Sequence, residues 1–323
     1  MQESILNFPK QFASKLKVEN AKNLKPAENF VVAGMGGSAY PTELLKIAHP
    51  ELNPASWRSY DLPSYLFSKT YHLSPNTLFI ASSYSGNTEE TLSAFEKARK
   101  QKLNLAAITV GGKLLALAKK NKIPFVQIPD THIQPRMSTG FFVSALSKLI
   151  GLKNNKEFIS LSKTLKPLAW QKKGKALSEN LWDQLPVIYA SEKNFPIAKA
   201  WKIKFNENTK IPAHANFIPE LNHNEMTGYD TKKTTASLSQ NFHLIFLEDE
   251  SDHPRVKRRF TVTKNLLAKK GLNQISIPLA GQTVWQKIFN STLLADWTTV
   301  YLAQYYGVDP ELVPMVEEFK KLI

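Results

Sequence analysis

Short apolar runs alternate with longer amphipathic stretches along most of the chain. Apolar runs bounded by polar or glycine-containing turns are typical of strands that are buried on both faces of a sheet. The stretches between them repeat apolar residues every three to four positions, which is the spacing of one helix face. This alternation predicts an α/β fold with largely parallel sheets, whose binding sites lie beyond the carboxyl ends of the strands. The predicted strands cover residues 30–33, 78–81, 105–110, 125–128, 187–190, 244–247 and 275–278.

The order of strand, polar turn, amphipathic helix, basic helix end, strand and glycine occurs twice. It runs from Leu78 as LFIASSYSGNTEETLSAFEKARKQKLNLAAITVGG and from Leu244 as LIFLEDESDHPRVKRRFTVTKNLLAKKGLNQISIPLAG. Such self-similarity predicts two related halves. In the second copy, one helix face packs on a sheet through the periodic residues Val256, Phe260, Thr263 and Leu267. We expect an N-terminal subdomain over 1–153, a helical connector over 154–185 and a C-terminal subdomain over 186–323 that ends in a helical tail.

Composition narrows the classes of protein that this pattern allows. The 323 residues include no cysteine, which excludes disulfides, thiolate catalysis and thiolate metal sites. No apolar run approaches the roughly 20 residues of a membrane span, and residues 1–30 lack the apolar block of a signal peptide. The seven histidines include no i, i+4 pair and no HExxH spacing. We expect a cytoplasmic protein without a metal, a cofactor or a membrane partner.

The formal net charge of +15 raises the question of a nucleic-acid partner. Most lysines are scattered, often near predicted helix ends, where cations complement the helix dipole. The dense run is Arg255-Val256-Lys257-Arg258-Arg259, and a solvated helix face is the favoured interpretation. No nucleic-acid partner is expected, although the positive field could steer an anionic small substrate.

The two copies of the repeat differ in the chemistry of the turn after the first strand. In the first copy the turn offers the hydroxyls of Ser82, Ser83, Ser85 and Thr88 around Gly86, whereas the second offers Glu248, Asp249, Glu250 and Asp252. A strand that enters a helix through small residues directs backbone N–H groups and the helix dipole at one point. Thr88 also suits a helix N-cap. Because a cap needs one hydroxyl and this turn supplies several, the first turn predicts a phosphate site and the second does not.

A second turn of small residues precedes this one. FVVAGMGGSAY places Gly34, Gly36, Gly37 and Ser38 between the first predicted strand and a helix predicted over 42–48. The segment is neither the dinucleotide motif GxGxxG, because Ala39 takes the sixth position, nor a Walker A loop. Its glycines predict a place where a ligand approaches the backbone closely.

GMGGSA followed by SSYSGNTEET resembles the sugar isomerase (SIS) domain, a flavodoxin-like αβα unit with a parallel sheet and a sugar-phosphate loop. Two such units in tandem resemble the phosphoglucose isomerase superfamily. The segments PRMSTGF, NENTKIPA, PELNHNE and the tail from DWTTVYLAQYYG onward are similar to the bifunctional phosphoglucose/phosphomannose isomerase family, and the match covers essentially the whole chain. The resemblance implies an aldose-ketose isomerase of carbohydrate metabolism that interconverts glucose 6-phosphate and fructose 6-phosphate through a cis-enediol.

The resemblance assigns roles to residues that match the family's motifs. It makes Glu207 the base, with Glu220 and Glu225 as rivals, and His223 the acid/base group that opens the sugar ring. In related isomerases this histidine enters the site from the neighbouring subunit, which implies a homodimer. The fixed positive charge near the enediolate is Arg136, and Lys320, or the adjacent Lys321, assists ring opening. The implied substrate-binding residues are Gly36, Gly37, Ser38, Ser83, Ser85 and Thr88.

Two departures from the family pattern leave alternatives open. Ala39 stands where many members have another glycine, and the segment Pro310-Glu311-Leu312-Val313-Pro314 lacks a hydroxyl residue that some members carry near the substrate. Acceptance of mannose 6-phosphate is therefore an open expectation, as the two epimers differ in configuration at C2. A non-catalytic sugar-phosphate sensor with SIS domains and an amino-sugar phosphate isomerase are the alternative functions.

Overall fold

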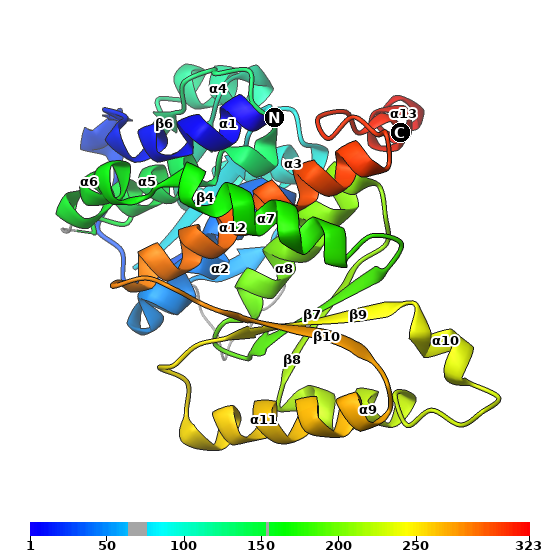
Figure 1. Cartoon of the computed structure of the whole chain (residues 1–323). Helices are drawn as coiled ribbons and strands as arrows, with labels where there is room; N and C mark the ends of the chain where they lie inside the picture. Colours follow the sequence, from blue (N-terminus) through cyan, green and yellow to red (C-terminus); the bar gives the residue numbers. More distant parts are fainter. Residues whose placement is uncertain (64–75, 153–154) are drawn as a thin grey trace. The chain divides into compact units, whose positions relative to one another are not determined.

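The chain folds into two compact units (Figure 1). The computed structural model describes residues 1–63, 76–152 and 155–323. The N-terminal unit is Asn7–Thr164, and the C-terminal unit comprises Met1–Leu6 and Leu165–Ile323. The predicted connector holds two helices, α6 (Asn155–Thr164) in the first unit and α7 (Pro167–Asn180) in the second.

A six-stranded sheet in the order β1-β6-β5-β4-β2-β3 forms the centre of the N-terminal unit. Neighbouring strands are parallel except for the antiparallel pair of β1 and β6. The strands are β1 Val18–Glu19, β2 Asn29–Ala33, β3 Ala55–Trp57, β4 Thr77–Ser83, β5 Asn104–Thr109 and β6 Phe125–Gln127. The helices, besides α6, are η1 Phe8–Ala13, η2 Ala21–Asn23, α2 Gly36–Ala48, η3 Pro50–Leu52, α3 Glu89–Lys100, α4 Gly112–Lys120, η5 Pro135–Met137 and α5 Thr139–Leu149.

Strand β4 shows why the predicted strands read as continuous apolar runs. Every residue of β4 is buried, because helices cover both faces of the sheet. On one face, Phe79 and Ala81 join a core that includes Phe95 of α3 and Leu114 of α4. Helices α2 and α5 contact the sheet as well, and they pack against each other. The carboxyl ends of β2 and β4 therefore stand over a well-packed core.

Four parallel strands in the order β10-β9-β7-β8 form the sheet of the C-terminal unit. The strands are β7 Leu185–Ser191, β8 His214–Ile218, β9 Phe242–Glu248 and β10 Asn273–Pro278. The helices, besides α7, are α1 Gln2–Asn7, of which the last residue falls in the N-terminal unit, α8 Phe195–Lys204, η6 Phe205–Thr209, η7 Glu220–Asn222, α9 Glu225–Gly228, α10 Ala236–Gln240, α11 Pro254–Lys269, α12 Val284–Tyr305 and α13 Pro314–Leu322.

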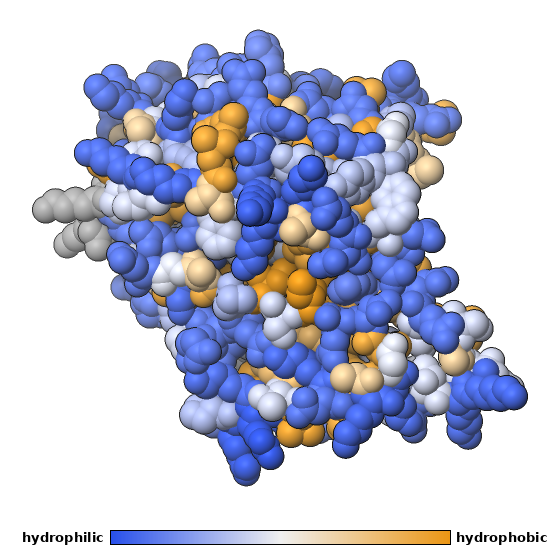
Figure 2. All heavy atoms as spheres, in the orientation of Figure 1, coloured by the Kyte–Doolittle hydropathy of each residue, from blue (hydrophilic) through white to orange (hydrophobic). Residues whose placement is uncertain are grey.

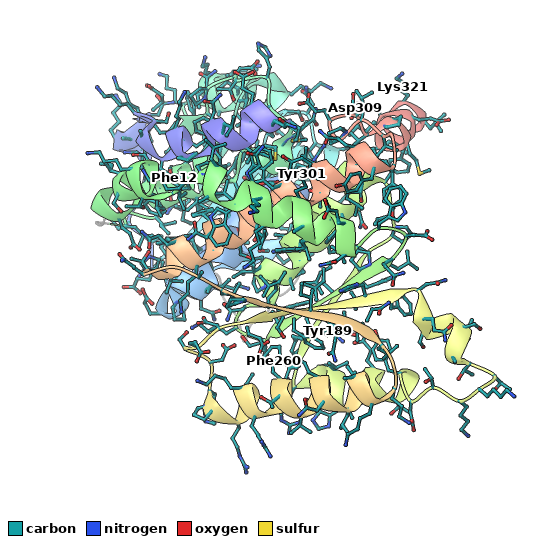
Figure 3. All side chains as sticks on the ribbon, in the orientation of Figure 1. Phe12, Tyr189, Phe260, Tyr301, Asp309 and Lys321 are labelled. Carbon is teal, nitrogen blue, oxygen red and sulfur yellow. The ribbon has the colours of Figure 1, made fainter. Side chains whose placement is uncertain are left out.

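Helices pack on both faces of the sheet of the C-terminal unit. Figure 1 shows α9 and α11 on one face of the sheet and α7, α8 and α12 on the other. Tyr189 of β7 and Phe260 of α11, labelled in Figure 3, are buried in the core between the sheet and α11. Thr263 and Leu267 are also buried, which confirms the helix face predicted from the sequence. Helix α12 is buried along most of its length, so the residues that it presents to α8 are fixed in place.

All seven predicted strands are present, and among the described residues three further strands were missed. Strands β1 and β3 are two and three residues long, and β8 is an edge strand whose side chains are mostly half-buried, so none has an apolar run. Helix α2 begins at Gly36 and not at the predicted residue 42, so the glycine turn forms the first turn of the helix. Within the described ranges, no helix has both the length and the apolar character that crossing a membrane would require.

Candidate active site

In the N-terminal unit, two turns of small residues lie side by side. Strands β2 and β4 are parallel neighbours whose last paired residues are Ala33 and Ala81, so both strands end at the same edge of the sheet. Hydrogen bonds join the turns directly: Ser82 Oγ donates to the Ser38 carbonyl at 2.8 Å, and Tyr84 N donates to Ser38 Oγ at 3.0 Å. The glycine turn and the serine turn therefore form one surface.

Within the serine turn, the hydroxyls bind one another and the backbone. Ser83 Oγ accepts from Gly86 N at 3.0 Å and lies 2.8 Å from Thr88 Oγ1. Thr88 is the N-cap residue of α3, as predicted, but its hydroxyl makes this bond to Ser83 in place of a capping bond to the helix. Ser85 is exposed and its hydroxyl accepts from Asn87 N at 3.2 Å. Hydroxyls held in this way lie beside the first N–H groups of α3, which have no acceptor within the helix.

Two glycines allow the backbone to approach closely around this surface. Gly86 has a φ of +69°, and a Cβ there would lie 1.9 Å from the Gly111 carbonyl oxygen. A Cβ on Gly37 would lie 3.0 Å from the Pro135 carbonyl oxygen and 3.3 Å from Arg136 N. A side chain at Gly86 would displace the neighbouring backbone, so the serine turn depends on glycine, while a Cβ at Gly37 would press on the backbone of η5.

Arg136 is brought against the glycine turn by this close approach. It lies in the short helix η5, its side chain is buried, and its guanidinium donates to Gln134 Oε1 at 3.4 Å. A buried guanidinium keeps its charge and presents planar donors. The N-terminal unit therefore places neutral hydroxyls, helix N–H groups and one fixed cation in neighbouring segments, and this combination suits an anion.

In the C-terminal unit, Glu207 lies in the π-helical turn η6, which continues α8. Short π-helical segments are rare and occur frequently at functional sites. The turn ends at Lys210, which has a left-handed φ of 59° and whose ammonium donates to the Glu207 carbonyl. The Glu207 side chain is half-buried, so the wide turn leaves it partly accessible.

An ion pair and an amide anchor the Glu207 turn to α12. Lys204 Nζ binds Asp296 Oδ1, and the two side chains are only 4% and 1% exposed. Asn208 Nδ2 donates to Thr299 Oγ1 at 2.8 Å. These contacts lie on either side of Glu207, so its backbone is fixed against a buried helix. Sequence analysis missed this support, although a single acid inside the apolar run STLLADWTTV signals a buried charge that needs a partner.

His223 follows the short helix η7 and is exposed. Its backbone N–H donates to the Glu220 carbonyl at 3.0 Å, and Leu221, two residues earlier, is fully buried in the core under α11. The imidazole therefore projects from a turn whose base is fixed.

The two acids beside His223 have other partners. Glu225 accepts hydrogen bonds from Tyr189 Oη at 2.8 Å and from Asn216 Nδ2 at 2.6 Å. Burial raises the pKa of the Tyr189 hydroxyl, so it stays protonated and donates. Glu220 accepts from Asn224. Both carboxylates thus bind side chains other than the imidazole, and Glu225 serves to fix the chain after His223.

Beside this segment, a groove of about 850 Å³ opens between α8 and the edge strand β8. It is lined by Phe195, Lys199, Lys202, His214, Ala215, Asn216, Asn224, Glu225 and Gly228. The residues that follow His223 therefore form one wall of a basic groove in the C-terminal unit.

Lys320 lies on the last helix, α13, where its ammonium donates to Glu317 at 2.7 Å. No residue of α13 is buried, and Lys321, labelled in Figure 3, is exposed too. Met315, Val316, Phe319 and Leu322 give the helix an exposed apolar face. The structure does not favour either lysine as the catalytic one.

The acidic turn of the second repeat is neutralised from within its own unit. Asp249 is buried and accepts from Lys287 Nζ at 2.6 Å and from Ser251 N at 3.0 Å. Burial alone would raise the pKa of the Asp249 carboxyl, but these hydrogen bonds lower it to about 2. Asp252, also buried, accepts from Ser191 at 2.8 Å. The turn that carries neutral hydroxyls in the first repeat carries buried acids and their hydrogen-bond partners in the second.

Comparison with known proteins identifies the family. The family model described as the bacterial phospho-glucose isomerase C-terminal SIS domain matches residues 170–323. The bifunctional phosphoglucose/phosphomannose isomerase of Aquifex aeolicus is 34% identical, with 93% of this chain and 92% of that protein covered. The protein of the same name from Caldicellulosiruptor bescii is 34% identical, with 99% and 98% covered.

A solved structure shares the fold at lower identity. A hypothetical protein of Thermus thermophilus superposes with a TM-score of 0.71 at 20% identity, over 99% of this chain and 86% of that one. Together with the SIS-domain model, this likeness confirms the predicted fold class. The chain belongs to the bifunctional phosphoglucose/phosphomannose isomerase family.

Proposed function

We propose that this protein interconverts glucose 6-phosphate and mannose 6-phosphate with fructose 6-phosphate. The observation that carries the proposal is the joined pair of small-residue turns beside a buried arginine, in a chain of this family. The turns offer hydroxyls and helix N–H groups to a phosphate. Both aldoses are included because the relatives are named for both activities.

The reaction moves a proton between C1 and C2 of the open-chain sugar through a cis-enediol. Glu207 is the proposed base, because a partly accessible carboxylate on a fixed turn can take the proton and return it. Arg136 is proposed to stabilise the negative charge that develops on the enediolate oxygen. Ser83, Ser85 and Thr88 hold the phosphate together with the glycine turn of Gly36, Gly37 and Ser38.

Ring opening is assigned to His223, whose exposed imidazole exchanges protons near neutral pH. We further propose that the protein is a homodimer and that each His223 serves the site of the other subunit. The supporting observation is that this side chain is exposed beside a groove, where a second subunit can reach it. The assistance of ring opening by a lysine of the tail, Lys320 or Lys321, stays a prediction.

Separate assays with glucose 6-phosphate and mannose 6-phosphate test the proposal. Fructose 6-phosphate should form from both sugars. Formation from glucose 6-phosphate alone would restrict the substrate range, and formation from neither would overturn the proposal in favour of a sugar-phosphate sensor.

Replacing Thr88 with valine should raise the KM for glucose 6-phosphate about tenfold and leave kcat nearly unchanged, because one hydrogen bond to a charged phosphate is lost in ground state and transition state alike. Steady-state kinetics and calorimetric titration with the sugar phosphate measure the effect. Ser93→Ala is the matched control on the same helix, since that hydroxyl accepts from Asp61 N at 3.0 Å. An unchanged KM in Thr88→Val would remove Thr88 from the phosphate site.

A further inference from the structure

Helix α11 reaches the turn that carries His223 through the residue immediately before it. Asn222 Nδ2 donates to Thr263 Oγ1 at 2.7 Å, and Arg259 Nη1 donates to Asn222 Oδ1 at 3.3 Å. Both ends of the Asn222 amide are thus bound by residues one helical turn apart. We propose that Thr263 and Arg259 are positioning residues, which hold His223 in its working orientation through Asn222; this inference rests on the role proposed for His223.

The helix that makes these contacts is itself fixed. Phe260 and Leu267 of α11 are buried in the core against the sheet, and Thr263 is 2% exposed. Lys264 Nζ donates to Glu248 Oε1 at 2.6 Å at the end of β9. Thr263 therefore offers its hydroxyl from a rigid support, as precise positioning requires.

The chain after His223 is held from the opposite side. Glu225 is bound by Tyr189 of β7 and Asn216 of β8, and Tyr229 Oη lies 2.9 Å from Tyr189 Oη. Because Tyr189 donates to the carboxylate, Tyr229 donates to Tyr189. The segment is clamped before and after His223 by side chains of the folded core, while the imidazole itself is exposed.

The hydrogen bond to Asn222 gives a role to Arg259, one residue of the dense basic run at residues 255–259. Arg255, Arg258 and Arg259 are exposed on α11, as predicted for a solvated helix face, yet Arg259 also binds Asn222. Figure 2 shows an apolar spot among hydrophilic spheres over α11, where Val262 and Leu266 are exposed. These two residues line a hollow of about 240 Å³ together with Asn222 and Thr263. The hydrogen bond between Asn222 and Thr263 therefore lies where the core under α11 meets the surface.

The first test replaces the hydroxyl of Thr263 and then restores it. Thr263→Val should lower kcat about tenfold with little change in KM, because a misplaced imidazole weakens a transition-state interaction and leaves phosphate binding intact. Thr263→Ser keeps the hydroxyl and should retain kcat within about twofold. The control is Thr261→Val, two residues earlier on α11, where the hydroxyl donates to the Lys257 carbonyl. If Thr263→Val fails to fold, Asn222→Ala removes the same hydrogen bond by deleting its donor.

A double-mutant cycle with His223→Asn separates positioning from a structural effect. If Thr263 acts through His223, Thr263→Val should cause no further loss in the residual activity of His223→Asn. Full activity of Thr263→Val, or a full additional loss in the double variant, would overturn the inference and leave the proposed function untouched. Full activity of His223→Asn would instead remove His223 from the proposed mechanism.

Discussion

Glu207→Gln should reduce isomerisation of glucose 6-phosphate by about 10²–10⁴-fold while binding of the sugar phosphate persists. An amide cannot accept the C2 proton, and proton transfer by a positioned base contributes about 10²–10⁴ in rate. The fold should be kept, because Lys210 closes the turn on the Glu207 carbonyl, which glutamine retains. A coupled assay for turnover and calorimetric titration for binding measure the two effects.

The rival acids provide the controls for this experiment. Glu220→Gln and Glu225→Gln leave Glu207 in place, and each carboxylate already accepts hydrogen bonds from neighbouring side chains. If one of these variants lost turnover while Glu207→Gln kept it, the base would have been assigned to the wrong residue.

The same variant tests the proposed contribution of His223 across a dimer. Glu207→Gln and His223→Asn should each retain only a small residual activity when assayed alone. If one site uses Glu207 of one subunit and His223 of the other, mixing and exchanging the two variants should restore activity to a fraction of the sites. Absence of any recovery, with subunit exchange demonstrated independently, would argue that both residues serve one site from the same chain.

Lys204→Met should destabilise the C-terminal unit by about 3–5 kcal/mol, the cost of leaving a buried carboxylate without its ionic partner. Lys204 and Asp296 are almost fully buried and lie directly before and beneath the Glu207 turn. The double variant Lys204→Met, Asp296→Leu should recover most of the loss, since a buried ion pair is often replaceable by apolar side chains.

Urea unfolding followed by tryptophan fluorescence measures this effect. Five of the six tryptophans, all except Trp57, belong to the C-terminal unit, so the signal reports chiefly on that unit. Lys202→Met, two residues earlier on α8, is the matched control and should change the free energy of unfolding by less than about 0.5 kcal/mol. A loss in Lys204→Met no larger than in this control would show that the ion pair does not hold the turn.

The sequence predicted those parts of the fold that hydrophobic burial decides. Strand β4 could be recognised because both of its faces are buried, whereas β8 could not, since its exposed edge position leaves no apolar run. The glycine and serine turns were each recognised as ligand-binding candidates because small residues between a strand and a helix are a local pattern. That the two turns adjoin was not predicted, since it depends on the order of the strands in the sheet.

The supports of the site could not be predicted in the same way. The bond from Asn222 to Thr263 joins residues 41 positions apart, and the pair of Lys204 with Asp296 spans 92. No local pattern encodes such a pairing, because it depends on how helices pack on a sheet. Thr88 shows the same limit at short range: its position as N-cap was readable, but its hydroxyl binds Ser83.

Incubating the protein with fructose 6-phosphate in D₂O, followed by NMR, tests the central claim most directly. Isomerisation through an enediol predicts that glucose 6-phosphate and mannose 6-phosphate both appear, with deuterium at C2 where the proton has exchanged with solvent at the base. Binding of fructose 6-phosphate without formation of either aldose would contradict the account and indicate a sugar-phosphate sensor.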